Sequence, residues 1–418
     1  MSDAAQAPLL AMVSSVIPES RELYVPREIA ALRAAGIAVL PASIFRPNHD
    51  IIQPEHEALR REAFPCRPWA PSTWLGALAE CARRPRAVLG ILRDLLVWGC
   101  RSPEQLLKTL LLFPAATRLA RHGRQHGITW VHAQWANVSS TTGYVAARLM
   151  GVPFSFSIHG EPIFNKRPCG LLALKCRDAA FAVSCNDAAV RYLLTHGAIA
   201  SERIHRIHHG VDRARFSPGA TKVPNTPFRL VTAGRLERSK GLPILLEAVA
   251  RLRAAGRPVV LEIIGSGPEE AMLRRQAEER AIADAVTFTP YLAQRELPDR
   301  YRAADAFVLT AREAWHWGIP NVLLEAMACG TAAVATELPS MTGFFVPDTH
   351  YLPARDGDAA DAARQIARLM DEAPLRATLE RNGPPFVATH FDWTTNLQAF
   401  VERVRTAFAQ SAETGDGR

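Results

Sequence analysis

The chain has 418 residues, more than one ordinary hydrophobic core organises, so its length predicts two domains of about 200 residues each. Hydrophobic residues contribute 48% and charged residues 22%, which excludes a disordered or fibrous chain and is typical of a globular enzyme. The formal net charge of +8 suits an anionic ligand such as a nucleotide diphosphate, or an anionic membrane surface. The sequence has no zinc-ligand spacing, lysine-rich arm or RNA-binding aromatic signature, so we do not expect nucleic acid as a partner.

The first domain is expected to span residues 1–215 and opens with a strand-helix-strand pattern. Leu9–Val16 predicts a strand, Pro26–Ala35 a helix followed by Gly36, and Ile37–Ala42 the second strand. This alternation favours a parallel α/β sheet. Apolar runs downstream predict four more strands and an intervening helix: Ile128–Ala133, Ser140–Met150 (helix), Phe154–Ile158, Ala179–Val183 and Arg203–Ile207.

Residues 76–126 form a basic amphipathic stretch. They contain nine Lys or Arg residues against three acidic residues, interleaved with Leu, Val, Phe113 and Trp98. Such a stretch can lie on an anionic bilayer, but it can also form helices that face the core and expose a solvated basic side. The sequence leaves both interpretations open.

The second domain, residues 216–418, follows a proline-rich linker at Pro218–Pro227 and restarts the β-α alternation. Its expected elements are strands at Phe228–Ala233, Val259–Ile264, Val286–Thr289 and Ala306–Leu309, and helices at Pro243–Ala255, Val322–Cys329, Ala359–Met370 and Phe391–Ala409. Arg235 and Lys240 flank the turn GRLERSKG, which opens a helix, so their cationic groups are placed to clamp a diphosphate. The segment Asp356-Gly-Asp358 opens another helix, where it is expected to be a cap rather than a metal site.

The run from Thr310 to Gly330 connects a buried strand to a helix. Gly318 and Pro320 stand where the chain turns, and the helix that follows offers unpaired N-terminal amides to phosphate or hydroxyl oxygens. Glu325 projects from its first turns and is expected to accept hydrogen bonds from a sugar's hydroxyl groups.

The cysteines and the N-terminus bear on location. Seven scattered cysteines without a CxxC pair predict reduced thiols rather than disulfides or a metal site. The first residues lack a basic segment and include Asp3, so they make a poor signal peptide, and no apolar run approaches the roughly 20 residues of a membrane span. These features predict a cytoplasmic protein. Attachment to the inner face of the membrane is an alternative that they do not exclude.

The run GIPNVLLEAMACG resembles the C-terminal signature of retaining glycosyltransferase family 4, whose exopolysaccharide and colanic-acid members share further motifs with this chain. HHGVDRARFSP resembles the family's turn between domains, and GR…KG its diphosphate site. The resemblance implies a GT-B fold: two Rossmann-like domains facing each other across a cleft, with a last helix that returns to the first domain. It also implies metal-independent transfer from a nucleoside-diphosphate sugar to a glycan or lipid-linked acceptor, with no cofactor.

The same resemblance assigns roles to single residues. Arg235 and Lys240 would neutralise the leaving diphosphate, and Glu325 would hold the ribose. The glycine turn and the loop before the helix would contact the donor: Gly265, Gly267, Gly318, Ile319, Pro320 and Asn321. His159, at the end of a strand similar to the family's His-Gly strand, would position the donor sugar, although a structural histidine is the alternative. Glu22 would face the acceptor or be a solvated loop residue.

Two acidic positions of the family are replaced here, by Trp317 and Gly343. An indole stacks on a sugar but donates only one hydrogen bond. Glu313 on the same loop could substitute, and Trp315, His316 and Trp317 could form a binding surface. Three interpretations follow: an active enzyme with unusual donor handling, an inactive nucleotide-binding relative, or an obligate partner subunit that binds nucleotide or glycan. A nucleotide-sugar 2-epimerase on the same architecture fits the motifs less well.

Overall fold

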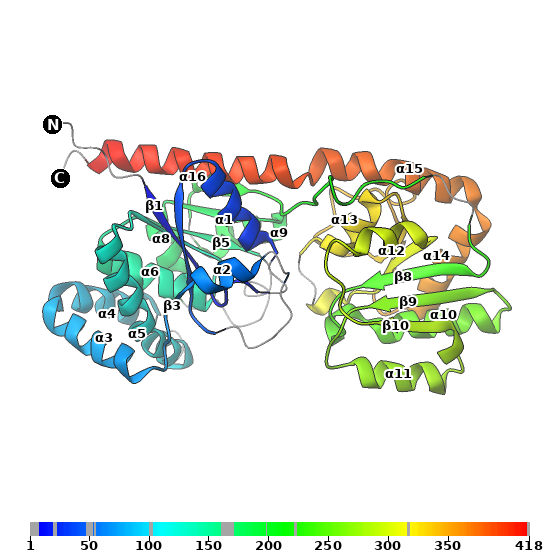
Figure 1. Cartoon of the computed structure of the whole chain (residues 1–418), viewed down its shortest axis with the longest axis horizontal. Coiled ribbons are helices and arrows are strands. Elements are labelled where there is room, and N and C mark those ends of the chain that lie inside the picture. Colours follow the sequence, from blue (N-terminus) through cyan, green and yellow to red (C-terminus); the bar gives the residue numbers. More distant parts are fainter. Residues whose placement is uncertain are drawn as a thin grey trace. The chain divides into compact units, whose positions relative to one another are not determined.

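The computed structural model describes residues 8–19, 23–46, 53, 56–99, 103–159, 171–197, 199–220, 224–315 and 318–415. The chain divides into two compact units. Unit 1 comprises Met1–His208 together with Leu397–Arg418, and unit 2 comprises His209–Asn396. Each unit contains its own parallel sheet with helices on both faces (Figure 1), so the expected fold class of two Rossmann-like α/β units is confirmed.

Unit 1 is built on a seven-stranded parallel sheet in the order β3-β2-β1-β4-β5-β6-β7. Its strands are β1 (Leu9–Ser14), β2 (Ala38–Ser43), β3 (Phe64–Pro65), β4 (Trp130–Ala133), β5 (Phe154–Ile158), β6 (Phe181–Ser184) and β7 (Ile204–Arg206). Alternate side chains of β1 enter different cores: Ala11 and Val13 face one side of the sheet, and Leu10 and Met12 face the other. Both faces of the strand are therefore buried, as expected for a parallel sheet.

The helices of unit 1 cover these two faces. They are α1 (Tyr24–Ala34), α2 (Glu57–Glu62), α3 (Pro71–Arg83), α4 (Pro85–Gly99), α5 (Pro103–His126), α6 (Val138–Met150), α8 (Leu172–Asp178) and α9 (Asp187–Tyr192). Helices α4, α5, α6 and α8 pack on one face, and α1 packs on the other (Figure 1). The last helix, α16 (Trp393–Gly415), also contributes Phe400 and Val404 to the second face.

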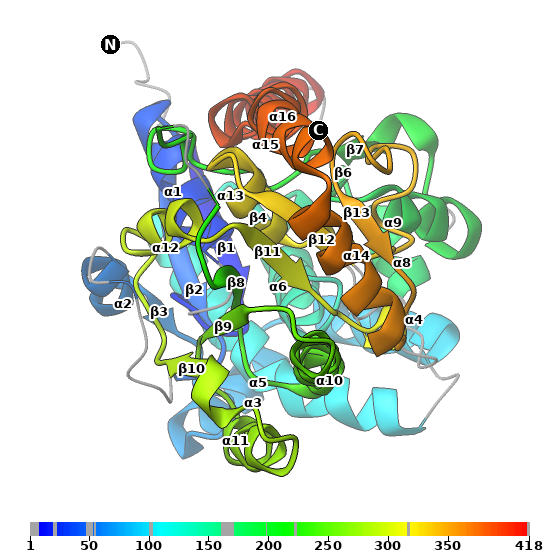
Figure 2. The same ribbon diagram turned by 90° about the vertical axis from the view of Figure 1, so that its right-hand side faces the viewer.

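Unit 2 contains a six-stranded parallel sheet in the order β10-β9-β8-β11-β12-β13, which Figure 2 shows nearly end-on. Its strands are β8 (Phe228–Ala233), β9 (Val259–Ile264), β10 (Val286–Thr289), β11 (Ala306–Leu309), β12 (Ala332–Thr336) and β13 (Leu352–Ala354). Its helices are α10 (Leu242–Ala254), α11 (Glu270–Glu279), α12 (Leu297–Ala303), α13 (Asn321–Ala328), α14 (Ala359–Asp371) and α15 (Ala373–His390).

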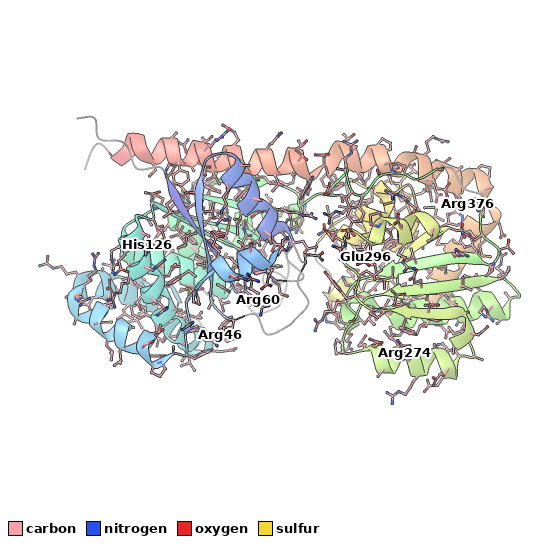
Figure 3. All side chains as sticks on the ribbon, in the orientation of Figure 1. Arg46, Arg60, His126, Arg274, Glu296 and Arg376 are labelled. Carbon is pink, nitrogen blue, oxygen red and sulfur yellow. The ribbon has the colours of Figure 1, made fainter. Side chains whose placement is uncertain are left out.

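The two faces of this sheet also have separate cores. Phe228 and Leu230 of β8 pack with α10, α11 and α14, whereas Val231 and Ala233 pack with α12, α13 and α15 (Figure 2). Side chains fill the space between each sheet and its helices (Figure 3). This packing holds the carboxyl ends of the strands in fixed register, and the loops that follow them carry most of the predicted site.

Residues 76–126 fold as most of α3, α4 and α5, which agrees with the helical interpretation of this stretch, and both leucines and basic residues are exposed on it. Several described elements were not predicted from the sequence, among them α11, α12, α15, β12 and β13. Among the described residues, no helix combines the length and the apolar character that crossing a membrane requires.

Candidate functional site

The predicted donor-binding residues of unit 2 gather where the winding of its sheet reverses. The chain runs from the central strand β8 outward to β9 and β10, then crosses to β11 on the other side of β8. The connections after β8 and β11 therefore diverge, which leaves a crevice at the carboxyl ends of these strands, and this is where open α/β sheets bind ligands. The predicted glycine turn follows β9, and the loop into α13 follows β11.

The glycine turn packs backbone against backbone with the loop that follows β8. Gly265 has φ of +139°, and a Cβ atom built on it would lie 1.9 Å from the carbonyl oxygen of Gly234. A Cβ on Gly267 would lie 2.3 Å from the carbonyl oxygen of Leu236. The Leu236 amide donates to the Ser266 carbonyl over 3.1 Å. Only glycine fits these positions, because any side chain would push the two loops apart.

The two predicted cations lie on the loop after β8. Arg235 is exposed, and its Nε is 3.0 Å from Oε2 of Glu237. The Thr310 hydroxyl, at the end of β11, donates to the carbonyl oxygens of Lys240 (3.2 Å) and Gly241 (3.1 Å) and so ties the loop to the neighbouring strand. Burial lowers the pKa of Lys240 below the ordinary lysine value, while the Glu237 carboxylate acts in the opposite direction. A bound anion would favour the charged ammonium.

The loop from Gly318 to Asn321 leads into α13. Its N-cap residue is Pro320, in an extended conformation, and no side chain of the described residues caps this helix. The Ser340 hydroxyl donates to the Gly318 carbonyl over 2.9 Å and holds the loop in place. Ile319 packs partly against the core. The first amides of α13 are thus held at the crevice, where an oxygen anion would be favoured.

Glu325 is only 6% exposed and lies in the second turn of α13. Gln294 Nε2 donates to its Oε1 over 3.1 Å, and the Tyr301 hydroxyl donates to its Oε2 over 3.2 Å. Burial, together with this carboxylate, raises the pKa of Tyr301 well above its ordinary value, so the phenol stays protonated and keeps donating. Sequence reasoning singled out Glu325 but missed Gln294 and Tyr301, because neither belongs to a motif and only the fold brings them to the carboxylate.

The loop after β11 contains the family's replaced acidic position. Glu313 is exposed in the short turn Glu313–Trp315. Trp315 is 41% exposed, and the Arg238 guanidinium lies 4.4 Å from the centre of its ring. Arg312 on this loop bonds Asp356 over 2.8 Å. His316 and Trp317 lie outside the described residues, so the binding surface that they could form with Trp315, and the place of Trp317 near the donor sugar, stay predictions.

The second replaced position, Gly343, has a backbone reason to be glycine. Its φ is +89°, in the left-handed region that other residues adopt rarely, although a Cβ there would meet no atom within 4 Å. An acidic side chain would therefore fit sterically at this position, but the left-handed backbone would be strained by it. Asp358 is the N-cap of α14, where it accepts from the Asp361 amide over 2.9 Å, which confirms its predicted role as a cap.

In unit 1, His159 follows β5 and is 8% exposed. Its Nε2 donates to Oε1 of Gln134 over 3.1 Å, and Nε2 of Gln134 in turn donates to the Glu28 carboxylate over 2.6 Å. The rings of Tyr24 and Trp135 meet the imidazole edge-on, at 4.7 and 5.3 Å between ring centres. These contacts fix the orientation of His159 and are compatible with either predicted role.

The acceptor-side residue that the sequence singled out, Glu22, lies outside the described residues. Its predicted contact with an acceptor therefore stays a prediction.

Comparison with known proteins identifies the family. Residues 215–385 match the family model described as glycosyl transferases group 1, and residues 70–215 match the model described as Glycosyltransferase Family 4. D-inositol 3-phosphate glycosyltransferase 1 of Catenulispora acidiphila is 30% identical over 69% of this chain and 73% of its own length. The chain belongs to glycosyltransferase family 4. It is a glycosyltransferase of the GT-B type.

Other members of the family are also similar. A putative colanic acid biosynthesis glycosyltransferase, WcaL of Escherichia coli K12, is 32% identical over 40% of this chain and 42% of its own length. Among solved structures, Anabaena Alr3699/HepE in complex with UDP superposes with a TM-score of 0.70 over 96% of this chain and 100% of its own, at 16% identity. At that identity the structural likeness shows the fold alone.

Proposed function

We propose that this glycosyltransferase moves a sugar from a nucleoside-diphosphate sugar to a glycan or lipid-linked acceptor, with retention, in surface or exopolysaccharide biosynthesis. One observation carries the proposal: Arg235, Lys240, the Gly265–Gly267 turn and the start of α13 all follow strands at the reversal point of the unit 2 sheet. Cations, close backbone approach and helix-terminal amides together fit a diphosphate better than any other common ligand. The UDP in the similar Anabaena protein and the name of the E. coli relative support the donor and the pathway class.

In the proposed reaction the acceptor hydroxyl oxygen bonds to the anomeric carbon on the face from which the diphosphate leaves. The carbon–oxygen bond to the diphosphate breaks, and the acceptor proton passes to an oxygen of the departing phosphate. Arg235 and Lys240 would neutralise the charge that develops on this leaving group, which is the main electrostatic contribution to catalysis. The carboxylate of Glu325, held by Gln294 and Tyr301, would accept hydrogen bonds from the ribose.

The test is thermal unfolding with a panel of nucleoside diphosphates and their sugars. A ligand at about 100 times its Kd raises the free energy of unfolding by about 2.7 kcal/mol, which is readily measured. We expect one sugar nucleotide to stabilise the protein more than its bare diphosphate, and Lys240→Ala to remove most of both effects. Full stabilisation of the Lys240→Ala variant would contradict the assignment of the diphosphate site.

A second candidate, a nucleotide-binding relative without transferase activity, is favoured by the replacement of both acidic positions of the family, at Trp317 and Gly343. The left-handed backbone at Gly343 would also strain an acidic residue there. In that case a bare diphosphate would stabilise the protein as much as any sugar nucleotide. Incubation with the stabilising donor would then release no sugar, either to water or to an added acceptor. Release or transfer of the sugar with its anomeric configuration retained would exclude this candidate.

A further inference from the structure

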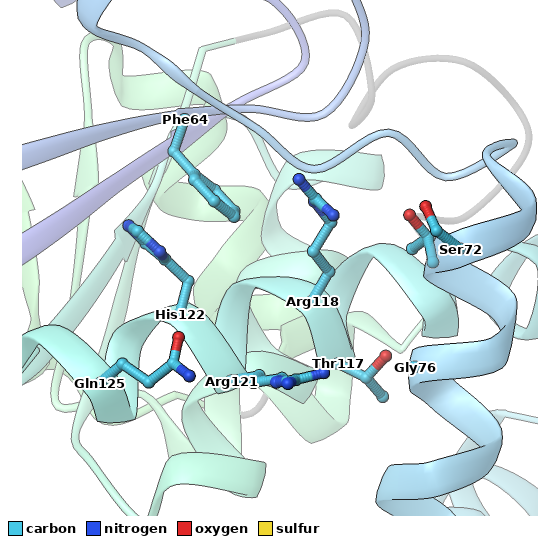
Figure 4. A pocket seen from close by; sticks show the side chains of 9 residues that line it. Phe64, Ser72, Gly76, Thr117, Arg118, Arg121, His122 and Gln125 are labelled. Atoms are coloured by element: carbon cyan, nitrogen blue, oxygen red, sulfur yellow. The ribbon is translucent and has the colours of Figure 1, made fainter.

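Unit 1 contains a pocket of about 230 Å³ that none of the predicted site residues lines. It lies between α3, which contributes Ser72, Thr73 and Gly76, and α5, which contributes Arg118, Arg121 and His122. Figure 4 shows Arg118 and His122 rising from α5 toward Phe64, with Ser72 across the opening. Arg118 and His122 are four residues apart and so share one face of α5, and Arg121 extends along the helix toward Thr117 on the floor of the same pocket (Figure 4).

The pocket is cationic and lacks a counter-charge. No Asp or Glu is among the residues that line it. Arg118 donates from Nε to the Pro65 carbonyl over 3.0 Å and lies 5.4 Å from the centre of the Phe64 ring. In the part of the chain that the structure describes, neither Arg118 nor Arg121 forms an ion pair. By contrast, Glu80, a buried carboxylate of α3, bonds Arg124 instead.

A buried hydroxyl group in the pocket wall has no partner. Thr73 is 2% exposed, and its Oγ1 has no hydrogen-bond partner among the described residues. Leaving such a group unsatisfied costs about 1–3 kcal/mol, which a ligand oxygen would recover if a small shift of α3 opened the hydroxyl group to the pocket. Burial, followed by the charges of His126 and Arg118, lowers the pKa of His122. The smaller, electrostatic part of this pKa shift has the sign expected beside the Arg118 charge, whereas the burial part would oppose a charge of either sign.

We propose that this pocket binds a phosphate group, held by the guanidinium groups of Arg118 and Arg121 and by the hydroxyl groups of α3. Two guanidinium groups without an acidic partner among the described residues, together with the hydroxyl groups of α3, match a tetrahedral oxyanion. The site is separate from the diphosphate site of unit 2 and goes beyond the proposed function. The phosphate belongs either to a soluble phosphate ester or to a lipid headgroup.

The surface beside the pocket makes a lipid source worth testing. Three apolar side chains of α3 are exposed: Trp74 (40%), Leu75 (68%) and Leu78 (67%). They immediately follow or flank the pocket residues Thr73 and Gly76 in the same helix. A membrane-bound phosphate would place these side chains near acyl chains, whereas a soluble ester would leave them in water.

The experiment uses two pairs of matched variants. A Cβ on Gly76 or on Gly90 of α4 would meet no atom within 4 Å, so Gly76→Glu places a carboxylate by the pocket without a clash, and Gly90→Glu is its control. Arg118→Gln with Arg121→Gln removes the cations, and Arg83→Gln with Arg86→Gln removes two exposed basic residues outside the pocket lining. All variants carry Lys240→Met, so that phosphate binding in unit 2 is weakened equally.

Two assays separate the sources of phosphate. Calorimetry measures binding of inorganic phosphate and glycerol phosphate, and co-sedimentation measures binding to phosphatidylcholine vesicles with and without phosphatidylglycerol. We expect the pocket variants to lose at least about tenfold in affinity relative to their controls, the equivalent of about 1.4 kcal/mol. If the pocket variants lose affinity for inorganic phosphate or glycerol phosphate in calorimetry, the ligand is a soluble ester. If they lose only their binding to vesicles that contain phosphatidylglycerol, the ligand is a lipid headgroup.

Two results would overturn the proposal. One is equal binding by the pocket variants and their controls in both assays. The other is that the protein with intact arginines and Gly76 binds neither phosphate nor anionic vesicles. Both results are independent of the donor site, since nucleotide binding is measured separately in protein that retains Lys240.

Discussion

The two sheets of this protein share one winding order but carry different chemistry at their carboxyl ends. In each, the first strand is central, the next two lie on one side of it, and the fourth lies on the other side. In unit 2 the loops at this point hold Arg235, Lys240 and the Gly265–Gly267 turn. In unit 1 the carboxyl ends of β4 and β5, on the other side of the first strand, hold Gln134 and His159, bonded to each other over 3.1 Å.

The same topology therefore leaves a crevice in each sheet, and the loop residues give the two crevices different chemistry. Glycines let the backbones of unit 2 approach closely, and cations next to helix amides make the place attractive to a diphosphate. Unit 1 has aromatic rings and a buried histidine–glutamine–glutamate chain there instead, without a cationic side chain in that chain. Four substitutions test this contrast.

The largest effect is expected at Gly265. Gly265→Ala places a Cβ against the Gly234 carbonyl in a backbone conformation that alanine disfavours, so we expect a loss of about 3 kcal/mol in unfolding free energy and loss of nucleotide binding. Gly256→Ala is the control, because Gly256 also has positive φ but open space around its Cβ, and about 1 kcal/mol is expected there. Urea unfolding measures both, and equal losses would contradict the close-approach argument.

Lys240→Met should separate binding from stability. Loss of a charge-assisted contact predicts about ten- to a hundredfold weaker binding of nucleoside diphosphate by calorimetry. The folded protein lowers the pKa of Lys240 below 10.5. Between the folded and the unfolded pKa, the unfolded chain therefore holds more protons than the folded protein, and the free energy of unfolding increases with pH over that range. The variant without nucleotide should lose this alkaline increase. If the variant binds nucleoside diphosphate as tightly as the parent protein does, Lys240 does not belong to a diphosphate site in unit 2.

His132 predicts that acid destabilises the core of unit 1. Burial lowers its pKa to about 3, and both ring nitrogens are bonded, to the hydroxyl groups of Ser155 and Ser157. Since the unfolded histidine titrates near 6.5, stability from this group is present above that pH and falls by up to about 1.4 kcal/mol per pH unit below it. His132→Gln should flatten the pH dependence of urea unfolding between pH 6.5 and 4. An unchanged slope would show that other groups control the acid response.

The smallest effect is expected at Trp315. Trp315→Ala removes the ring over which Arg238 lies, an exposed cation–π contact worth about 0.5–1 kcal/mol. We therefore expect little change in unfolding free energy and, if the ring borders the donor sugar, a larger change in binding of the sugar nucleotide than of its diphosphate. Trp315→Phe is the matched control that keeps a ring. Equal weakening for both ligands would remove Trp315 from the sugar side of the site.

Several elements could be predicted from the sequence because a local pattern specifies them. The strand at Val259–Ile264 has five β-branched or leucine residues, interrupted only by Glu262, and the predicted bounds match β9 residue for residue. The glycine turn and the GR…KG loop were predicted because their residue types are demanded by backbone geometry and charge. Asp358 was predicted as a cap for the same reason. Patterns of this kind need no distant partner.

Other elements depend on distant parts of the chain. β12 is the sequence Ala332–Thr336, rich in alanine, which has little preference for strands, and it forms because β11 and β13 pair with it on both sides. α15 contains Pro384 and Pro385, which discourage a helix prediction, yet its Phe386 and Val387 are buried in a core of unit 2. Burial of apolar area outweighed the local preference in both cases.

The sequence by itself determined the family, the two parallel sheets and the cationic turn, because each is written in neighbouring residues. Only the tertiary structure decided what surrounds Glu325 and what lines the pocket between α3 and α5. Gln294 and Tyr301 lie 31 and 24 residues before Glu325, and α3 and α5 meet across the whole of α4. Such groupings depend on which helices the sheets bring together. A local sequence pattern carries no information on which residues far apart in the chain come into contact.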